Sequence, residues 1–310
     1  MNAPLVSVCL ITYNHIKYIS QAIDGVLNQK TDFKWELIIA DDFSTDGTRE
    51  IILGYRQKFP NSIKLILQSE NVGAAKNWKD LIFSANSKYI AYFEGDDYWI
   101  DPTRIQNQVT VLENNPEIIL CAGNSVVIDD RQPGVVKYFR PYISRCTLNQ
   151  MRLPDLIKYF PAFQTSSTLF RNFNRNWPSF VFSSIVGDLP LFTFLASKGN
   201  IYYTDDVLSC YRLHEGGLSR LSKKKIITMN RGLILLCQTL DTYLNCIHHD
   251  LYEVKILKYR KRLILALNEE GSFISTYKEV IRYCFTSNES FVKIIKFVMK
   301  NIGVSLRLKL

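Results

Sequence analysis

The chain has 310 residues, of which 47% are hydrophobic and 22% are charged. This composition predicts a globular protein with one large core, or with a core and a smaller appendage, and it excludes a disordered or repetitive chain. The net charge of +9 is unevenly divided, because residues 1–220 hold 22 basic and 22 acidic side chains whereas residues 221–310 hold 16 and 7. We therefore expect a neutral front part and a basic rear part.

Signals for export and for membrane insertion are weak. No basic segment precedes an apolar leader, and no run reaches the roughly 18–20 apolar residues that span a bilayer. The seven cysteines are scattered without a C-x-x-C pair, which indicates reduced thiols rather than disulfides or zinc. We expect a cytoplasmic protein. Its basic C-terminal part is also compatible with a peripheral position at the inner face of the cytoplasmic membrane.

The front of the chain alternates strand and helix patterns. Short β-branched apolar runs predict buried strands at Val6–Ile11, Glu36–Ala40, Ile63–Leu67, Tyr89–Phe93 and Ile118–Ala122. The helical patterns between them comprise the stripe from Tyr18 to Leu27, a second helix that ends near Phe59, a third at about Ala74–Ala85 and a fourth with Pro102 in its first turn. This alternation predicts an α/β fold with a mostly parallel sheet and helices on both faces.

The second half of the chain is less regular. Residues 133–165 predict an irregular insert over the ligand site. Further strands are predicted at Thr165–Phe170, Ile201–Tyr203 and Val207–Leu213, around a helix from about Leu189 to Ser197. The sequence from Ser222 onward is helical in pattern. We therefore predict a domain of residues 1–220 and a basic helical region of residues 221–310.

Two pairs of aspartates follow predicted strands. Asp41-Asp42 follow the second strand, and Asp96-Asp97 follow the fourth. Ligands of parallel sheets bind outside the carboxyl ends of the strands, and adjacent carboxylates repel each other unless a cation or hydrogen-bond donors relieve them. One Asp-Asp pair alone is typical of a solvated loop or a cap. Two pairs at equivalent points predict a site for a divalent cation and a polar ligand.

The motifs of residues 5–215 together resemble those of the family 2 glycosyltransferases, which have the GT-A fold and include enzymes of bacterial surface-polysaccharide synthesis. The matching segments are Val6–Asn14, Val26–Gln29, Ile39–Thr48, Asn71–Gly73 with Ala75–Asn77, and Glu94–Asp97 in the place of the Asp-x-Asp metal motif. Two residues depart from the family pattern. Lys76 stands where Arg is usual, which replaces a planar fork by a point charge, and Glu94 replaces the first Asp of the metal motif.

The resemblance implies a nucleotide-diphosphate sugar as donor, with UDP- or dTDP-sugars favoured, and Mn²⁺ or Mg²⁺ as the cofactor. The residues that it implies for the nucleotide sugar are Thr12, Tyr13, Asn14, Asp41, Asp42, Lys76, Glu94, Asp96 and Arg212. The residues that it implies for the metal are Asp96, Asp97 and His214, with Asp96 as the leading carboxylate.

The resemblance further implies an inverting transfer to a hydroxyl of a glycan or lipid-linked acceptor, with Asp188 as the catalytic base. The alternative for Asp188 is an N-cap of the following helix, which is a common position for Asp. The stretch Gln164–Thr168 is interpreted either as a set of hydroxyls for the sugars or as an ordinary strand. Trp99 is interpreted as a stacking surface for a sugar or as a core residue. His15, His248 and His249 have no comparable context, although His15 is expected at the rim of the nucleotide loop.

Competing enzyme classes lack their motifs. A nucleotidyltransferase would need a Gly-rich phosphate loop after the first strand, and a dinucleotide dehydrogenase would need G-x-G-x-x-G. Thr12–His15 supplies neither. The third alternative is a catalytically silent nucleotide-sugar-binding or scaffold protein of the same fold. The presence of Asp42, Asp96, Asp188 and His214 argues against it.

The C-terminal segment pairs an apolar stripe with lysines. Phe291–Ile302 has apolar residues at helical spacing, with Lys293, Lys296 and Lys300 on another face. This pattern is typical of a helix at an anionic membrane surface. A packed helix or a contact within a homo-oligomer is the alternative. The segment has no recognised nucleic-acid-binding motif, so we expect no nucleic-acid partner.

Overall fold

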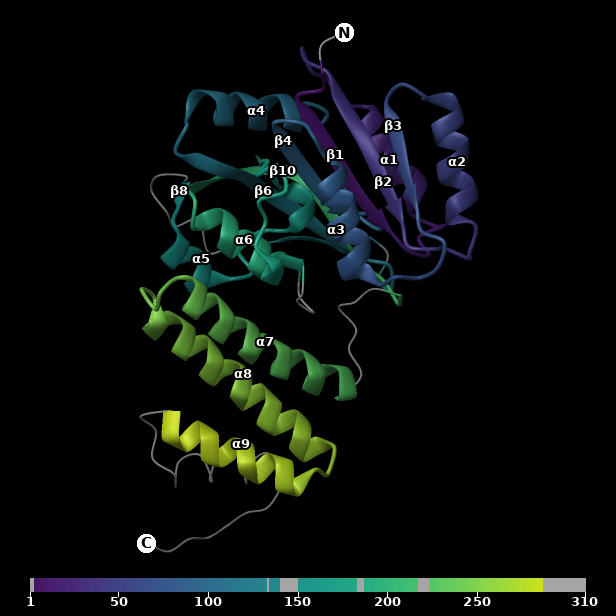
Figure 1. The fold of residues 1–310 in the computed structure, drawn as a ribbon. Coiled ribbons are helices and arrows are strands. Elements are labelled where there is room, and N and C mark those ends of the chain that lie inside the picture. Colours follow the sequence, from purple (N-terminus) through teal and green to yellow (C-terminus); the bar gives the residue numbers. More distant parts are fainter. Residues whose placement is uncertain (1–2, 133, 140–149, 183–186, 217–222, 287–310) are drawn as a thin grey trace, which may run out of the picture. The chain divides into compact units, whose positions relative to one another are not determined.

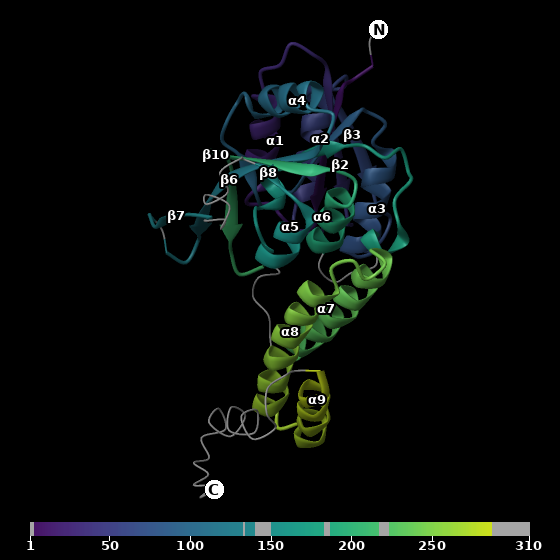
Figure 2. The same cartoon turned by 90° about the vertical axis from the view of Figure 1, so that its left-hand side faces the viewer.

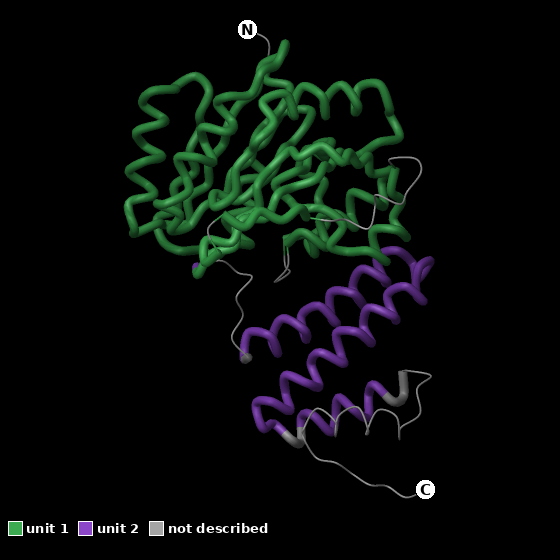
Figure 3. Tube along the Cα trace, turned by 180° about the vertical axis from the view of Figure 1, so that it is seen from behind, with its two compact units in different colours: residues 1–183, 187–215 green, residues 184–186, 216–310 purple. Residues whose placement is uncertain are grey.

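The computed structural model describes residues 3–132, 134–139, 150–182, 187–216 and 223–286. The chain divides into two compact units, and Figure 3 shows them in different colours. The first unit comprises residues 1–183 with 187–215, and the second comprises residues 216–310 with 184–186. The predicted helix at Phe291–Ile302 lies outside the described residues.

The first unit contains a mixed sheet whose central strands run parallel (Figure 1). Its order is β3-β2-β1-β4-β9-β6-β10-β5, with β7 paired to β6 and β8 paired to β10. The strands are β1 Val6–Thr12, β2 Trp35–Asp41, β3 Ile63–Leu67, β4 Tyr89–Glu94, β5 Tyr98–Trp99, β6 Ile118–Asp129, β7 Val136–Tyr138, β8 Gln150–Met151, β9 Leu169–Arg171 and β10 Asn200–Leu213. β9 runs antiparallel to both β4 and β6, so β6 and β10 end at the same edge as β1, β2 and β4.

Helices cover both faces of this sheet. Figure 2 shows α1, α2 and α4 on one face and α3, α5 and α6 on the other. Their bounds are α1 Ile19–Leu27, α2 Thr48–Lys58, α3 Ala74–Ser84, α4 Arg104–Asn114, α5 Leu153–Tyr159 and α6 Asp188–Ala196. In α1 the buried residues Ile19, Ala22, Ile23 and Val26 recur at helical spacing, which is the stripe that turns this helix toward the sheet.

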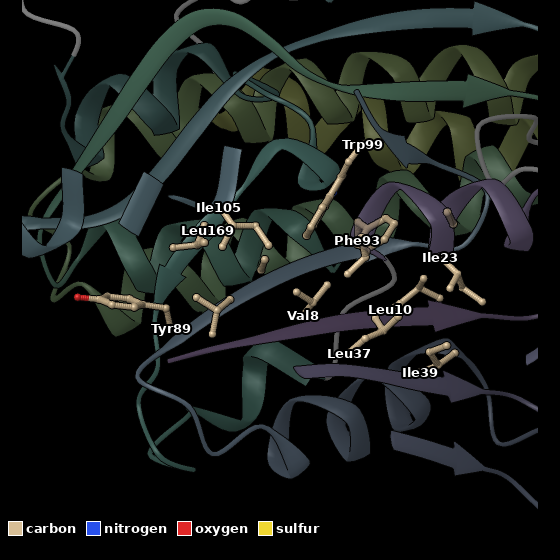
Figure 4. Packing of buried hydrophobic residues seen from close by; sticks show 14 of the residues in the cluster. Val8, Leu10, Ile23, Leu37, Ile39, Tyr89, Phe93, Trp99, Ile105 and Leu169 are labelled. Carbon is tan, nitrogen blue, oxygen red and sulfur yellow. The ribbon is translucent and has the colours of Figure 1, made fainter. Parts of the chain in front are cut away.

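The main core lies between α1 and the sheet (Figure 4). Val8 and Leu10 of β1 pack with Leu37 and Ile39 of β2 and with Phe93 of β4, and all five are fully buried. Central parallel strands are covered on both faces, so apolar runs, rather than alternation, mark them in the sequence. This rigid core holds the strand ends in fixed positions.

The observed fold confirms the predicted α/β class with a mostly parallel sheet, and four details differ from prediction. The insert contains β7, β8 and α5. The two strands predicted between residues 201 and 213 are one strand, β10, whose pairing with β6 shifts register between Thr204 and Val207. The fourth helix begins at Arg104, after Pro102. The predicted strand at residues 165–170 is a 3-10 turn, η2 (Thr165–Ser167), followed by β9.

The second unit is helical in its described part, as predicted. It contains α7 (Lys223–Tyr243), α8 (His249–Glu269) and α9 (Phe273–Thr286). Leu263 and Leu267 of α8 pack against Ile227 of α7, whereas Ile264 packs against Val280 of α9. Helix α8 is therefore shared between two small apolar clusters. Among the helices of the described ranges, none is both long and apolar enough to cross a membrane.

Candidate active site

The loops that follow β1 and β2 are tied together by backbone amides. The Asn14 N–H donates to Ser44 Oγ at 2.9 Å, and the Thr45 N–H donates to Asn14 Oδ1 at 2.9 Å. The Ile16 N–H donates to Asp46 Oδ2 at 3.0 Å. Asn14 has a φ of 55°, in the left-handed region that asparagine tolerates better than most residues. The predicted nucleotide loop is thus held at both of its ends.

The two aspartates after β2 anchor these loops. Asp41 is fully buried and accepts from Arg49 Nε at 2.6 Å and from the Ser44 N–H. Asp42 is also buried and accepts from the Val72 N–H at 2.7 Å. Burial raises the pKa of Asp42, although amide hydrogen bonds from the residue 72–73 loop oppose the shift. The charge repulsion expected of this pair is relieved within the protein, because Arg49 neutralises Asp41.

Gly95 lets two strand-end segments approach each other closely. Its N–H donates to the Ile11 carbonyl at 2.9 Å. A Cβ at this position would lie 2.9 Å from Thr12 Oγ1 and 3.1 Å from His15 Nδ1. A larger residue would therefore push apart the end of β1 and the turn after β4. In this arrangement Thr12 is buried against Gly95, whereas the Tyr13 side chain is 45% exposed at the rim.

Asp96 and two histidines form one cluster. His214 Nε2 lies 3.0 Å from Asp96 Oδ2, and His15 Nε2 lies 3.9 Å from the same oxygen. The two imidazole rings are 6.2 Å apart in an edge-to-face arrangement. Burial alone would raise the pKa of Asp96, but the His214 hydrogen bond and the nearby His15 outweigh it, and the pKa is lowered. Asp96 is therefore the ionised carboxylate at this edge.

The structure brings together the predicted ligands Asp96 and His214 but turns Asp97 away from them. Asp97 Oδ1 accepts from the Arg212 N–H at 3.0 Å, and its carboxyl group also accepts a hydrogen bond from Ser166. Burial and the negative charges of Asp96 and Glu94 raise the pKa of Asp97 well above its usual range. Asp97 thus ties the turn after β4 to the end of β10.

Arg212 is held by protein partners. Its Nε donates to the Asp96 carbonyl at 2.9 Å, and one terminal nitrogen donates to Gln21 Oε1 at 2.7 Å. Its guanidinium carbon lies 4.7 Å from the centre of the Tyr18 ring and 5.2 Å from that of Tyr98. Arg212 therefore holds the backbone at Asp96 in place. Its contact with phosphate stays a prediction.

Glu94 and Asp188 lie close enough for their charges to interact. Burial raises the pKa of Glu94 to about 8, and the carboxylates of Asp96 and Asp188 add to the shift. The Tyr92 hydroxyl is hydrogen-bonded to Glu94. Burial also raises the pKa of Asp188 to about 6. Near neutral pH, Glu94 is therefore mostly protonated whereas Asp188 is mostly ionised.

Asp188 is the first residue of α6, and Gly187 occupies the N-cap position. The alternative of an N-cap role for Asp188 is therefore wrong. Its Oδ1 accepts from the N–H of the next residue along the chain, Leu189, at 2.8 Å. The ideal Cβ position of Gly187 lies 4.0 Å from the Trp78 ring, which packs beside Tyr92. Asp188 is thus a half-buried residue at a helix start, where negative charge is favoured.

Three other features for which the sequence predicts a ligand contact do not belong to the cluster around Asp96. Lys76 is exposed in the first turn of α3 and pairs with Asp80 at 2.6 Å. Ser166, Ser167 and Thr168 are fully buried, so the interpretation of these hydroxyls as sugar contacts is wrong. The Ser166 hydroxyl instead lies 3.1 Å from Ser209 Oγ. Trp99 is a core residue, 4% exposed.

His15 lies in the cluster around Asp96, whereas the sequence places it only at the rim of the nucleotide loop and gives it no role. A lone histidine in a loop gives little signal, and only its place three residues after Thr12 connects it to the nucleotide loop. Tyr18 and Asp130 are also present without a predicted role. The Tyr18 hydroxyl donates to Asp130 Oδ2 at 2.6 Å, and the Tyr18 ring lies 4.8 Å from that of His214. Contacts across more than a hundred residues cannot be read from local pattern.

The donor set suits a divalent cation that is shared with a phosphate ligand. Within the described ranges, no group of three or more histidine, cysteine or acidic side chains is arranged to hold a metal ion. Mg²⁺ and related ions commonly bind one or two protein groups and take substrate phosphates and water for the rest. The ionised Asp96, beside the imidazole nitrogen of His214, matches that requirement.

Residues 7–176 match the glycosyl transferase family 2. This match covers more than half of the chain, and the chain therefore belongs to that family. TuaG of Bacillus subtilis, which is named as a glycosyltransferase of teichuronic acid biosynthesis, is 34% identical over 130 residues, covering 42% of this chain and 50% of TuaG. The glucosyltransferase WfgD of Escherichia coli is 32% identical over 130 residues, with coverage of 42% and 49%. The matched part spans a third of the length of a Mycobacterium tuberculosis relative and about half of the length of TuaG and WfgD.

Solved structures with a similar fold extend over nearly the whole chain. Residues 1–349 of Staphylococcus aureus TarS, in complex with UDP, superpose with a TM-score of 0.56 at 15% identity, covering 98% of this chain and 94% of that chain. The mannosyltransferase PcManGT of Pyrobaculum calidifontis, in complex with GDP-Man and Mn²⁺, gives a TM-score of 0.59 at 15% identity, with coverage of 97% and 88%. At these identities the likeness is one of fold.

Proposed function

We propose that this chain is an inverting, metal-dependent glycosyltransferase. It moves a sugar from a nucleotide-diphosphate donor to a hydroxyl of a glycan or lipid-linked acceptor in bacterial surface-polysaccharide synthesis. The observation that carries the proposal is the pairing of Asp96 with His214 at the same sheet edge as Glu94 and Asp188. One ionised carboxylate serves the leaving diphosphate, and a second, separate carboxylate is available for the acceptor.

The donor lies across the ends of β1, β2 and β4. Thr12, Tyr13 and Asn14 line the nucleotide pocket together with Asp41 and Asp42. Asp42 and the protonated Glu94 face the base and ribose, and an un-ionised carboxyl group can donate as well as accept hydrogen bonds. Lys76 leaves its Asp80 partner to neutralise phosphate. These roles rest on family membership and on the position of each residue at the sheet edge.

Mn²⁺ or Mg²⁺, held by Asp96 and His214, would stabilise the negative charge that develops on the leaving diphosphate. Asp188 removes the proton of the acceptor hydroxyl. Its pKa of about 6 makes it a stronger base than an ordinary aspartate while leaving it ionised at neutral pH. Arg212 holds the Asp96 backbone, and Asp97 holds that of Arg212.

Two relatives support the choice of substrates. WfgD is named as a glucosyltransferase with UDP-Glc as donor and a diphosphoundecaprenol-linked sugar as acceptor, and the name of TuaG refers to teichuronic acid biosynthesis. The charge of residues 221–310 adds a membrane component to the proposal, because a basic region is attracted to the anionic inner leaflet where such acceptors are exposed.

A panel of UDP-, dTDP- and GDP-sugars tests the proposal. Each donor is incubated with the full chain and Mn²⁺ or Mg²⁺, and release of the nucleoside diphosphate is measured with EDTA as the metal-free control. We expect slow hydrolysis of at least one donor, lost with EDTA. Binding of a donor without turnover in any combination would favour a silent binding protein. No binding of any donor would overturn the assignment.

A further inference from the structure

His15 is fixed at the edge of the proposed donor site by contacts on both sides of it in the chain. The preceding residue, Asn14, is bonded to Ser44 and Thr45. The following residue, Ile16, donates its N–H to Asp46. The side chain itself is 17% exposed. A loop tied in this way presents the imidazole in one direction without a large entropic cost when a ligand binds.

The two ring nitrogens of His15 have different surroundings. Nδ1 lies 3.2 Å from Thr12 Oγ1, within hydrogen-bond distance, and Nε2 lies 3.9 Å from Asp96 Oδ2, beyond it. The Asp96 carboxylate can only accept hydrogen bonds, whereas the Thr12 hydroxyl can donate. The tautomer that suits both neighbours therefore has its proton on Nε2, with Nδ1 accepting from Thr12.

The Nε2 atom of His15 lies near the Asp96 oxygen that His214 already contacts, at 3.9 Å. His214 Nε2 is 3.0 Å from Asp96 Oδ2, so the bond to that oxygen is made by His214 and not by His15. Gly95 lies beneath the His15 ring, where the absence of a Cβ makes room for it. The arrangement leaves a directed N–H donor next to Asp96 that does not close onto the carboxylate.

We propose that His15 is a further donor-binding residue, whose Nε2–H donates a hydrogen bond to the diphosphate of the nucleotide sugar. This inference rests on the proposed function, since it presumes that the diphosphate lies beside Asp96. The bland alternative is a packing role, in which the ring only fills the space above Gly95. The two roles differ in whether loss of the ring weakens the binding of the diphosphate more than that of the monophosphate.

The test compares a nucleoside diphosphate with its monophosphate. Binding of UDP and UMP, and of the dTDP/dTMP and GDP/GMP pairs, is measured by calorimetry in Mn²⁺ for the full-length wild type and its variants. His15→Gln keeps an N–H donor at the reach of Nε2, and His15→Asn places one only at the reach of Nδ1. His15→Ala removes both, and His248→Ala controls for loss of a histidine elsewhere. Thermal unfolding checks that each variant folds.

We expect His15→Ala and His15→Asn to weaken the diphosphate roughly three- to tenfold and the monophosphate less than twofold. His15→Gln should stay within twofold of wild type for both. Equal losses for the diphosphate and the monophosphate, or equal losses for all three variants, would overturn the inference in favour of packing, as would unchanged binding. A wild type that binds no nucleoside diphosphate would overturn the proposed function, and this inference with it.

Discussion

At the scale of single residues, neighbouring carboxyl groups at one sheet edge differ in charge because their surroundings differ. The pKa of Asp96 is lowered, since His214 and His15 outweigh its burial. The pKa of the adjacent Asp97 is raised by burial and by the charges of Asp96 and Glu94. One of the two can attract a cation, and the other serves as a backbone anchor. A pattern of two adjacent aspartates does not distinguish these roles.

The assignment of the base predicts a separation of binding from turnover. Asp188→Asn keeps the size of the side chain and its hydrogen bond to the Leu189 N–H but cannot take a proton. We expect the affinity for the donor to stay within about twofold, while transfer falls by roughly 10²–10⁴-fold. Calorimetry and a transfer assay measure the two quantities. Retained transfer in this variant would remove Asp188 from the role of base.

The raised pKa of Asp188 also predicts the shape of a pH profile. The base must be ionised to act, and a raised pKa moves the loss of the ionised form up to about pH 6. We expect kcat/KM to fall about tenfold per pH unit below that value. The profile is measured from pH 4.5 to 8 with stability monitored in parallel. A rate that stays flat down to pH 4.5 would place the base elsewhere.

At the scale of elements, the end of β2 depends on one ion pair with α2. Arg49 is 22% exposed, but its partner Asp41 has no exposed side-chain surface. Arg49→Met would leave the Asp41 carboxylate buried without a cation, which typically costs about 3–5 kcal/mol. We expect a loss of that order in chemical denaturation. Lys58→Met, at the exposed end of the same helix, is the control and should cost less than about 0.5 kcal/mol.

The double variant Asp41→Asn with Arg49→Met removes both charges and should recover part of the loss. If Arg49→Met costs no more than Lys58→Met, or if the double variant is as unstable as the single one, then the pair does not hold the strand end in the way described.

The elements around the site were predictable to different degrees for physical reasons. Continuous apolar runs identify β1–β4 closely, because buried parallel strands tolerate little else. The single strand β10 was predicted as two, because Asp205-Asp206 resemble a turn although they form an irregularity in pairing with β6. The buried hydroxyls of residues 165–168 resemble a strand or a polar surface in sequence. The polar partners of Ser166, Asp97 and Ser209, are distant in the chain.

The candidate site was predictable where a residue stands directly at a strand end or in a recognised motif. Asp42, Asp96 and His214 fall in that group. His15 and Arg49 do not, because the role of each depends on a contact in space that the local sequence pattern does not reveal. The sequence leaves Asp188 open between base and cap. The structure places Gly187 at the cap, and the role of Asp188 as base stays a prediction.

At the scale of the whole molecule, the chain combines a nearly neutral α/β unit with a basic helical one. We expect the full chain to bind vesicles that contain phosphatidylglycerol and not vesicles of phosphatidylcholine alone, with affinity falling as salt rises. Cosedimentation measures this. Replacing Lys293, Lys296 and Lys300 by Gln should weaken binding at least tenfold, at roughly 1 kcal/mol per lysine. Equal binding to both kinds of vesicle would contradict an electrostatic attachment.

We propose that the edge formed by β1, β4 and β10 carries metal-dependent chemistry on a nucleotide sugar. The most direct test measures Mn²⁺-dependent release of nucleoside diphosphate from the best donor by the wild type, by Asp96→Asn and by Asp24→Asn, an exposed aspartate of α1. Turnover should fall at least a hundredfold in Asp96→Asn, because the lost charge no longer supports the leaving diphosphate. It should be unchanged in Asp24→Asn. Equal turnover in Asp96→Asn and the wild type would contradict the account.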